Sequence, residues 1–393
     1  MTQTDQYRVR TGSGASDATD AWVAGEAAAR EARTALGDQE PALVIVYASV
    51  RYNLTKLLAA IRSILGTAPL VGATSTGHFR DGHLVPPGTG VAVLALTAGP
   101  YTFGVSCVDR LSANAEAAGA RLARTAREAA GTQQRRCGTL LLLADGLTPN
   151  HEALIFGIHS VFGAAVPVVG GAASDDRRLQ QTFVFHDDRV LTDAAVGVWI
   201  GSDRPLSITV GHGWQPLGLP LLVTRVDGRY VHEIGGRPAS EVFDEQIRVG
   251  DTERLDRMRP GGYYSTHAFG LIEPDGSYLV RGVIRDPGGQ IRTFAPLPPY
   301  SAVQVVGCDA ESLLTTSAEV AERALAGRDA SLLLVFSCVA RLDILGDRGP
   351  EEAHLIHKVA GAVPVFGTYT YGEFARTRSV IGYHNATVAT IAL

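Results

Sequence analysis

Lysine, methionine and long apolar runs are scarce in this chain of 393 residues. Lys56 and Lys358 are the only lysines and the net charge is −5, so we expect no nucleic-acid surface. No apolar run approaches the ~20 residues of a membrane-spanning helix, and residues 1–20 lack the apolar centre of a signal peptide. The sequence therefore predicts a cytoplasmic protein that binds neither nucleic acid nor a membrane.

Cysteine is also sparse. Cys107, Cys137, Cys308 and Cys338 lie far apart and lack the spacing of a metal site. Free thiols in a reducing compartment fit this pattern best. From the residues alone we predict no metal and no cofactor.

The apolar content, in contrast, is ample for a folded protein. Hydrophobic residues make up 46% of the chain and charged residues 19%, which excludes wholesale disorder. A chain of 393 residues exceeds the ~250–300 residues at which single cores stop growing. Two domains or a repeat array is therefore expected.

A short pattern of Pro, two apolar residues and Gly occurs three times, at residues 69–72, 167–170 and 364–367. Each copy follows an apolar run that predicts a strand buried on both faces, and a helical stretch lies between the two. We expect the Pro to begin a second strand and the Gly to allow a sharp turn at its end. The first strands are predicted at 43–47, 139–144 and 332–336, the helices before the Pro at 53–65, 152–162 and 351–360, and the last strands at 90–96, 195–200 and 387–393.

An Ala-rich helix opens each copy, at residues 17–36, 112–130 and 309–326. The predicted fold is thus α/β, with three related helix–strand–helix–strand–strand–strand units and right-handed parallel crossovers. Residues 207–302 differ, because they carry hairpin signals such as Asp227-Gly228 and Asp275-Gly276. They predict a mainly antiparallel β insert between the second and third units, with one short helix near 238–246.

Several motifs within these units resemble the FIST family. The resemblance covers most of the chain from about residue 40 and divides it into a flexible tail (1–15), a FIST N-like domain with two units (16–220) and a FIST C-like domain with the insert and the third unit (221–393). The motifs that carry it are Val71–Gly77, Val169–Ser174, Phe183–Phe185, Gly211–Gly218, Val226–Ala239, Phe336–Arg341, Phe366–Glu373 and Tyr383–Thr387.

This resemblance implies a sensory role in signal transduction with a small-molecule ligand, amino acids being among those proposed for the family. It also implies that the protein acts through a separate signalling output protein, because the units leave no room for a fused output domain. Some relatives bind haem and sense nitric oxide, which gives a haem sensor as an alternative function.

Charged and aromatic residues follow the strands of the third unit, where ligands bind in α/β folds. Arg341 and Glu373 could clamp the carboxylate and ammonium of an amino acid, or could form an ordinary salt bridge. Tyr369 and Tyr371 could line an aromatic wall or pack in the core. Asn385 belongs to the same motif region, and Thr74, Ser75, Thr76, Ser174 and Asp175 occupy the equivalent loops of the other units, where turn chemistry would also explain them.

Two further chemistries remain open. Cys338 could be the nucleophile of an enzyme acting on a small biosynthetic intermediate, with His384 or His357 as its base, although a buried structural cysteine is the plainer interpretation. His186, His212 or His384 could be an axial haem ligand, although a hydrogen-bonded structural histidine is the default.

Overall fold

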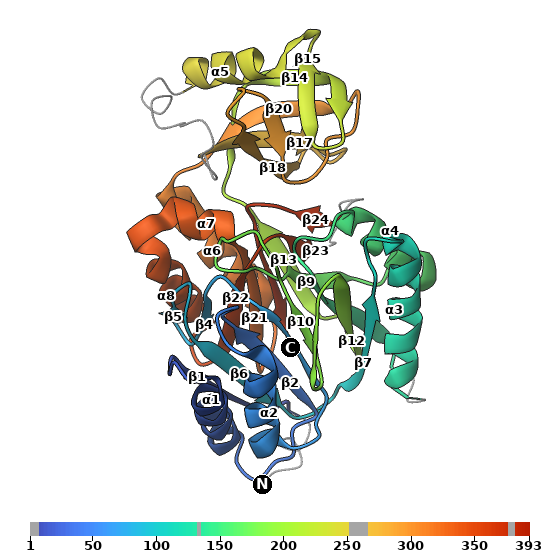
Figure 1. The fold of residues 1–393 in the computed structure, drawn as a ribbon, viewed down its shortest axis with the longest axis vertical. Helices are drawn as coiled ribbons and strands as arrows, with labels where there is room; N and C mark the ends of the chain where they lie inside the picture. Colours follow the sequence, from blue (N-terminus) through green and yellow to red (C-terminus); the bar gives the residue numbers. More distant parts are fainter. Residues whose placement is uncertain (1–7, 132–134, 251–265, 376–381) are drawn as a thin grey trace.

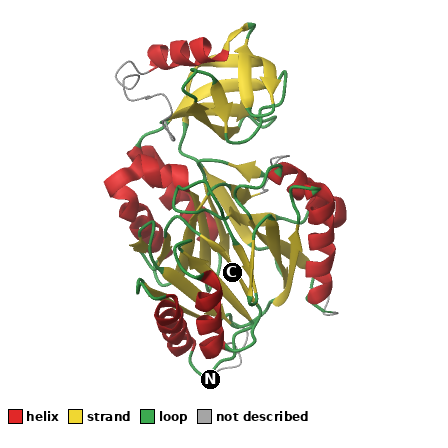
Figure 2. Cartoon of the chain, in the orientation of Figure 1, coloured by secondary structure: helices red, strands yellow, loops and turns green. Residues whose placement is uncertain are grey.

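The structure, a computed structural model, describes residues 8–131, 135–250, 266–375 and 382–393. The chain forms a body of three six-stranded sheets with helices on the outside, and a smaller barrel at one end of the body (Figures 1 and 2). The predicted mixed α/β class is confirmed. None of the described helices combines the length and apolar character needed to cross a membrane.

The first sheet shows the pattern of all three. Its strands, in spatial order, are β1 (Thr11–Ser16), β6 (Val91–Leu96), β2 (Leu43–Ala48), β3 (Leu70–Thr74), β10 (Val184–His186) and β11 (Arg189–Leu191). β2 and β3 run parallel, and α1 (Ala21–Leu36) and α2 (Leu54–Leu65) pack on the outer face. The inner face joins a core shared with the other sheets. Both faces are covered, which explains why the strand sequences are continuously apolar.

The other two sheets have the same order. The second consists of β7 (Thr102–Asp109), β12 (Ala194–Ser202), β8 (Cys137–Ala144), β9 (Val168–Ala172), β23 (Glu373–Ala375) and β24 (Tyr383–His384). The third consists of β13 (Ser207–Gly211), β25 (Val388–Ala392), β21 (Leu333–Cys338), β22 (Val365–Thr370), β4 (His78–Arg80) and β5 (His83–Val85). Their outer helices are α3 (Ala115–Ala129) and α4 (His151–Phe162) on the second sheet, and α6 (Ala310–Leu325), α7 (Val339–Leu345), the 3₁₀ turn Gly346–Arg348 and α8 (Gly349–Ala360) on the third.

Each sheet is completed by a hairpin from another part of the chain. The hairpin β10–β11 follows the second sheet's strands in sequence but pairs with β3, β23–β24 pairs with β9, and β4–β5 pairs with β22. The three exchanges close a ring, because the first unit donates to the third, the second to the first and the third to the second. No sheet is therefore complete without residues from two units.

The glycine of the Pro-apolar-apolar-Gly pattern makes this exchange possible. It lies inside the second strand and not at a turn, which corrects our expectation. In every sheet it stands opposite a buried phenylalanine of the incoming hairpin, in the pairs Gly72–Phe185, Gly170–Phe374 and Gly367–Phe79. A side chain at Gly72 or Gly367 would collide with the opposite ring. The pattern thus marks the strand that receives a foreign hairpin.

The first strand of each sheet was missed by the sequence. β1 covers residues 11–16 and pairs with β6 at the edge of the first sheet. A flexible tail was expected at residues 1–15, but most of its described part belongs to this strand. Apart from Thr11, its sequence lacks β-branched and aromatic residues because α1 lies directly on it. A side chain at Gly12 or Gly14 would strike the carbonyl oxygen of Ala32 or Ala28. Close packing thus selected residues that are untypical of strands.

Residues 215–307 form a closed antiparallel barrel, as the hairpin signals predict, whereas residues 207–211, expected in this insert, form β13 of the third sheet. Six strands pair in a ring and β16 extends it, while α5 (Ala239–Gly250) lies close to the predicted short helix. The barrel strands are β14 (Gln215–Asp227), β15 (Tyr230–Ile234), β16 (Arg237–Pro238), β17 (His267–Ile272), β18 (Tyr278–Arg285), β19 (Ile291–Thr293) and β20 (Ala302–Gly307).

Two contacts join the barrel to the body. Arg281 of β18 has a fully buried side chain, and it donates to Glu152 of α4 at 2.9 Å and to the carbonyl oxygen of Tyr383 at 3.1 Å. A hydrophobic cluster around Trp214 adds residues from β17, β20 and α6, and the indole N–H donates to the Ala386 carbonyl oxygen at 3.2 Å. The barrel therefore touches both the second and the third unit.

A buried ion pair lies inside the third unit. Arg341 donates to Glu352 at 2.8 and 2.9 Å, and neither side chain is exposed. The Glu352 carboxylate also accepts from Ser317, Ser337 and Tyr369 at 2.7 to 2.9 Å. Such a pair is costly to break because the remaining charge stays buried without its partner.

Removing one hairpin phenylalanine tests the exchange. Phe185→Ala should lower the free energy of unfolding by about 3–5 kcal/mol, since it empties a site closed on all sides. Urea denaturation followed by circular dichroism measures the change. Phe156→Ala is the matched control on α4, where the ring is 64% exposed, and should change stability by less than about 0.5 kcal/mol. Equal losses in the two variants would contradict the role given to the hairpin.

Arg341→Ala should cost about 3–5 kcal/mol of folding stability, since it leaves the Glu352 carboxylate buried without its cation. Arg348→Ala, just before α8, removes exposed ion pairs to Glu351 and Glu311 and should leave the urea midpoint nearly unchanged. A stable Arg341→Ala protein would contradict the structural assignment.

Candidate functional site

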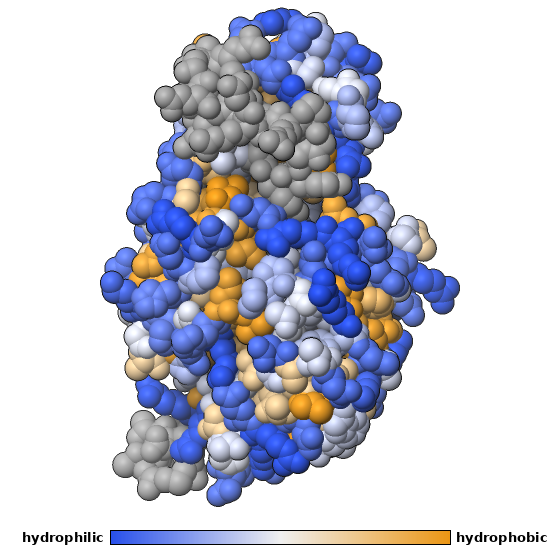
Figure 3. Space-filling model, turned by 60° about the vertical axis from the view of Figure 1, so that its left-hand side comes forward, coloured by the Kyte–Doolittle hydropathy of each residue, from blue (hydrophilic) through white to orange (hydrophobic). Residues whose placement is uncertain are grey.

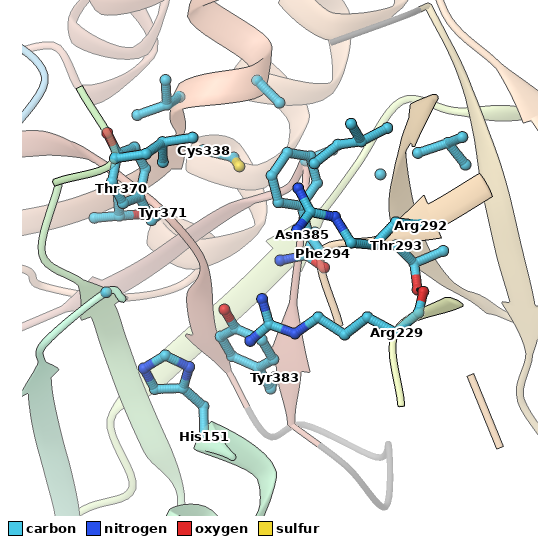
Figure 4. A pocket seen from close by; sticks show the side chains of 18 of the residues that line it. His151, Arg229, Arg292, Thr293, Phe294, Cys338, Thr370, Tyr371, Tyr383 and Asn385 are labelled. Atoms are coloured by element: carbon cyan, nitrogen blue, oxygen red, sulfur yellow. The ribbon is translucent and has the colours of Figure 1, made fainter. Parts of the chain in front are cut away.

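A cavity of about 340 Å³ lies between the barrel and the body (Figure 4). This volume is in the range of small-molecule sites, roughly 300–1,000 Å³. Its wall is formed by Gly146, Leu147, His151, Leu179, Trp214, Arg229, Gly282, Val283, Ile284, Arg292, Thr293, Phe294, Cys338, Val339, Ala340, Thr370, Tyr371, Tyr383, Asn385 and Ala386.

The body contributes three loops that follow strands. Gly146 and Leu147 come after β8, Cys338 ends β21, and Tyr371 comes after β22. Asp145 holds the first loop by accepting from the Leu147 N–H at 3.0 Å. These loops meet because parallel strands end at the same edge of a sheet and because the second and third sheets are joined by the exchanged hairpin β23–β24.

Asp175 fixes another part of the body wall. Its carboxylate accepts from the backbone N–H groups of Leu179, Gln180 and Gln181 at 2.7 to 2.9 Å, and also from the Tyr371 hydroxyl. Leu179 and Tyr371 both line the cavity. Asp175 therefore acts on the cavity by positioning its wall, with its own oxygens already bonded.

The barrel contributes two arginines and an aromatic ring. Arg229 lies in the turn between β14 and β15, and Arg292 lies on β19 opposite Tyr230. Figure 4 shows both guanidinium groups on the side of Tyr383 and Asn385, with Phe294 beside them. Neither arginine could be recognised from the sequence as a cavity residue, because the place of each depends on how the barrel packs against the body.

Asn385 is the candidate residue that the structure places most directly at the cavity. The residue is 3% exposed, lines the cavity, and its carboxamide oxygen has no hydrogen-bond partner. A buried acceptor without a partner costs roughly 1–3 kcal/mol. Such a group is a natural contact for a bound molecule.

Cys338 is part of this wall, and Glu373 lies behind it. Glu373 is fully buried and accepts from Thr370 and Thr387 hydroxyls, both at 2.7 Å. Burial raises the pKa of Glu373 to about 8, so the carboxyl is largely neutral at pH 7. Burial and the neighbouring Glu373 raise the pKa of the Cys338 thiol well above its usual value. A thiol in this setting lacks the thiolate character of an activated nucleophile.

The expected clamp of Arg341 and Glu373 is not formed. Arg341 is bonded to Glu352, to the carbonyl oxygens of His212 and Leu313, and to Ser317, and it does not line the cavity. Tyr369 belongs to the same buried network. Both were expected at the site, and both are instead part of the core of the third unit.

The candidate residues in the loops of the first two units are hydrogen-bonded within the protein, mostly to another unit. Thr74 exchanges hydrogen bonds with the backbone of Phe183, Ser75 bonds His78 at 3.1 Å, and Thr76 accepts from the Asp176 N–H at 3.0 Å. Ser174 donates to the Tyr369 carbonyl oxygen at 2.8 Å. None of these four residues lines the cavity within the described chain, and apart from the local Ser75–His78 bond their hydrogen bonds join different units.

The three histidines considered for haem also lie outside the described cavity wall. His384 donates to the Ala375 carbonyl oxygen at 2.7 Å, and His212 accepts from the Trp214 N–H at 2.9 Å. Burial lowers the pKa of each to about 4, so both are neutral. His186 is half-buried, 3.8 Å from Asp187. Both inner histidines are thus engaged with the backbone, and neither lines this cavity.

Sequence reasoning missed His151 and Tyr383 along with the two arginines. His151 bonds the Asp145 carbonyl oxygen at 2.8 Å and stacks on Tyr383 at 4.9 Å between ring centroids. Burial lowers the pKa of His151, so it adds no charge at neutral pH. Tyr383 stood beside Asn385 in a motif, which was an available signal.

The raised pKa of Glu373 predicts a pH dependence of stability. Between about pH 4.5 and about pH 8 the folded chain keeps a proton that the unfolded chain releases, so the free energy of unfolding falls as pH rises through this window. Glu373→Gln removes this titration, and its melting temperature should therefore gain on the parent's as pH rises. Differential scanning calorimetry from pH 5 to about pH 8 measures the difference. Glu351→Gln, at an exposed position, should run parallel to the parent, and parallel curves for both variants would refute the assignment.

Comparisons with known proteins cover nearly the whole chain. An uncharacterized protein of Mycobacterium tuberculosis strain H37Rv is 28% identical over 400 residues, covering 98% of this chain and 99% of the relative. An uncharacterized protein of Mycobacterium bovis is 29% identical over 401 residues, covering 98% of each chain. Among solved structures, a cyanuric acid hydrolase from A. caulinodans aligns over 98% of this chain and 99% of its own, with 10% identity. Its TM-score is 0.36, which is too low to support an inference about activity.

Family comparison gives the clearer result. The FIST N domain matches residues 42–237, which hold the strands of the first two units except β1, together with β13 and the start of the barrel. The FIST C domain matches residues 239–376, which hold the rest of the barrel and most of the third unit. These domains indicate a role in sensory signal transduction. With both domains in order along one chain, the protein belongs to the FIST family.

Proposed function

We propose that this FIST protein senses a small molecule that binds in the cavity between its barrel and its body. The observation that carries the proposal is the buried, unpartnered carboxamide oxygen of Asn385 in the wall of a cavity of about 340 Å³. The resemblance implies an amino acid or a related small acid as the ligand.

The position of the cavity supports a sensory role. Its wall combines residues of the barrel with residues of the second and third units. A ligand there would contact both parts and would favour whichever barrel position fits it best. A change in the barrel's position is a plausible signal to a separate output protein in the cytoplasm.

We assign no docking surface to the partner. The exposed large hydrophobic residues lie apart, for example Trp22 on α1, Phe156 on α4 and Tyr300 before β20. In Figure 3, hydrophobic residues on the visible face form separate groups among hydrophilic ones. Single exposed hydrophobic residues are common on any protein surface.

We also interpret the three sheets as copies of one unit. In each, a proline precedes the second strand, and its carbonyl oxygen accepts from the first residues of the neighbouring parallel strand at 2.9 to 3.0 Å. The repeated Gly–Phe pair supports the same interpretation. On this view the ligand site arose at one of three equivalent strand-end regions.

Ligand binding should raise the melting temperature by mass action, since the unfolded chain lacks the cavity. A thermal-shift panel of amino acids, keto acids, hydroxy acids, amides and neutral metabolites tests this. Ala340→Phe, which fills the cavity from α7, should abolish every shift seen with the parent. Ala35→Phe, the same change on the exposed side of α1, should leave the shifts intact. A well-folded parent with no response across the panel would refute the proposed function.

A further inference from the structure

We infer that the cavity takes a small organic acid and discriminates against a zwitterionic amino acid. Arg229 and Arg292 of the barrel would hold the acid group, and Asn385 of the body would accept a hydrogen bond from the far end of the molecule. This inference rests on the proposed function and narrows its ligand class.

The arginines of the barrel divide into two groups. Arg225, Arg237 and Arg285 pair with Glu233, Glu245 and Asp244 on the barrel itself, and Arg281 pairs with Glu152 of the body. Arg229 and Arg292 form no ion pair or side-chain hydrogen bond with another described residue, and both line the cavity. Among the described residues of the barrel, the unpaired guanidinium groups are thus the two at the cavity, which is the arrangement that a bound anion requires.

An ammonium group finds no matching charge there. Within the described chain, no carboxylate is among the cavity-lining residues. Glu152 lines an adjoining hollow but is bonded to Arg281 at 2.9 Å. Glu373 lies behind Cys338, and burial raises its pKa to about 8. A ligand ammonium would face two guanidinium groups without a counter-charge, which opposes binding.

The rest of the wall defines the remainder of the ligand. Phe294, Tyr371, Tyr383 and Trp214 give the cavity an aromatic lining. The Asn385 oxygen needs a donor, such as a hydroxyl or an amide N–H. An acid with an apolar or aromatic middle and a hydroxyl at its far end satisfies all three features.

Three probes with one skeleton separate the charge classes. They are 3-(4-hydroxyphenyl)propionate, its primary amide, and tyrosine, which adds an ammonium group to the same acid. Isothermal titration calorimetry at low salt should give the acid at least about tenfold tighter binding than either of the others. Equal or tighter binding of the amide or of tyrosine would overturn the inference.

Variants assign the contacts. Arg229→Gln and Arg292→Gln should each weaken binding of 3-(4-hydroxyphenyl)propionate by about tenfold or more and reduce the preference for acid over amide. Arg225→Gln removes an equal charge from the same barrel at an already paired position and should leave both unchanged. Circular dichroism checks that each variant is folded. If the two folded cavity variants bind the acid as tightly as the parent does, the inference fails.

The hydroxyl contact has its own test. 3-Phenylpropionate lacks the hydroxyl, so it should bind the parent more weakly than the hydroxylated acid, and the two should bind Asn385→Leu equally. Inorganic phosphate should bind more weakly than either acid, and equal binding would show an anion subsite only. If none of the three probes that share the hydroxyphenyl skeleton binds at millimolar concentration, this inference is overturned. If another compound of the thermal-shift panel still raises the melting temperature, the proposed function stands.

Discussion

The contact between a strand glycine and the phenylalanine of a foreign hairpin is the constraint on which the body depends. Each parallel pair includes a strand whose glycine stands opposite a phenylalanine of another unit, and at Gly72 and Gly367 the ring lies where a side chain would be. The exchange also builds the cavity. Because β23–β24 joins the second sheet, Tyr383 comes to lie against His151, and Asn385 follows it to the cavity wall.

Charge is handled in two different ways in this chain. Inside the body, Arg341 is surrounded by Glu352, Ser317 and backbone oxygens, so its charge is compensated where it stands. At the joint, Arg281 and Glu152 compensate each other across two parts of the molecule. Only at the cavity do described barrel arginines lie without such a partner. The protein thus supplies an anion to Arg341 and to Arg281, whereas Arg229 and Arg292 have none among the described residues.

The sequence located the strands and helices well where the physics is local. Apolar runs buried on both faces, Asp-Gly turns and the proline before β3 all appeared where expected. β1 could not be recognised, since its glycines are chosen by the approach of α1 and not by strand preference. Glu352 was hidden for a similar reason, because on a predicted helix it looked like an ordinary surface acid. Arg229 and Arg292 depend on the docking of the barrel, which no local pattern describes.

The ring of exchanged hairpins has a consequence for synthesis on the ribosome. The second sheet has all its own strands by Ser202, yet the edge of β9 must wait for residues 373–384 before it is covered. Meanwhile the hairpin β4–β5, made early, has no strand to join until β22 emerges. Unpaired edges held open for so long invite pairing with other chains. Folding of this protein is thus tied to completion of its C-terminus, and nascent chains that stop short should be captured by chaperones or aggregate.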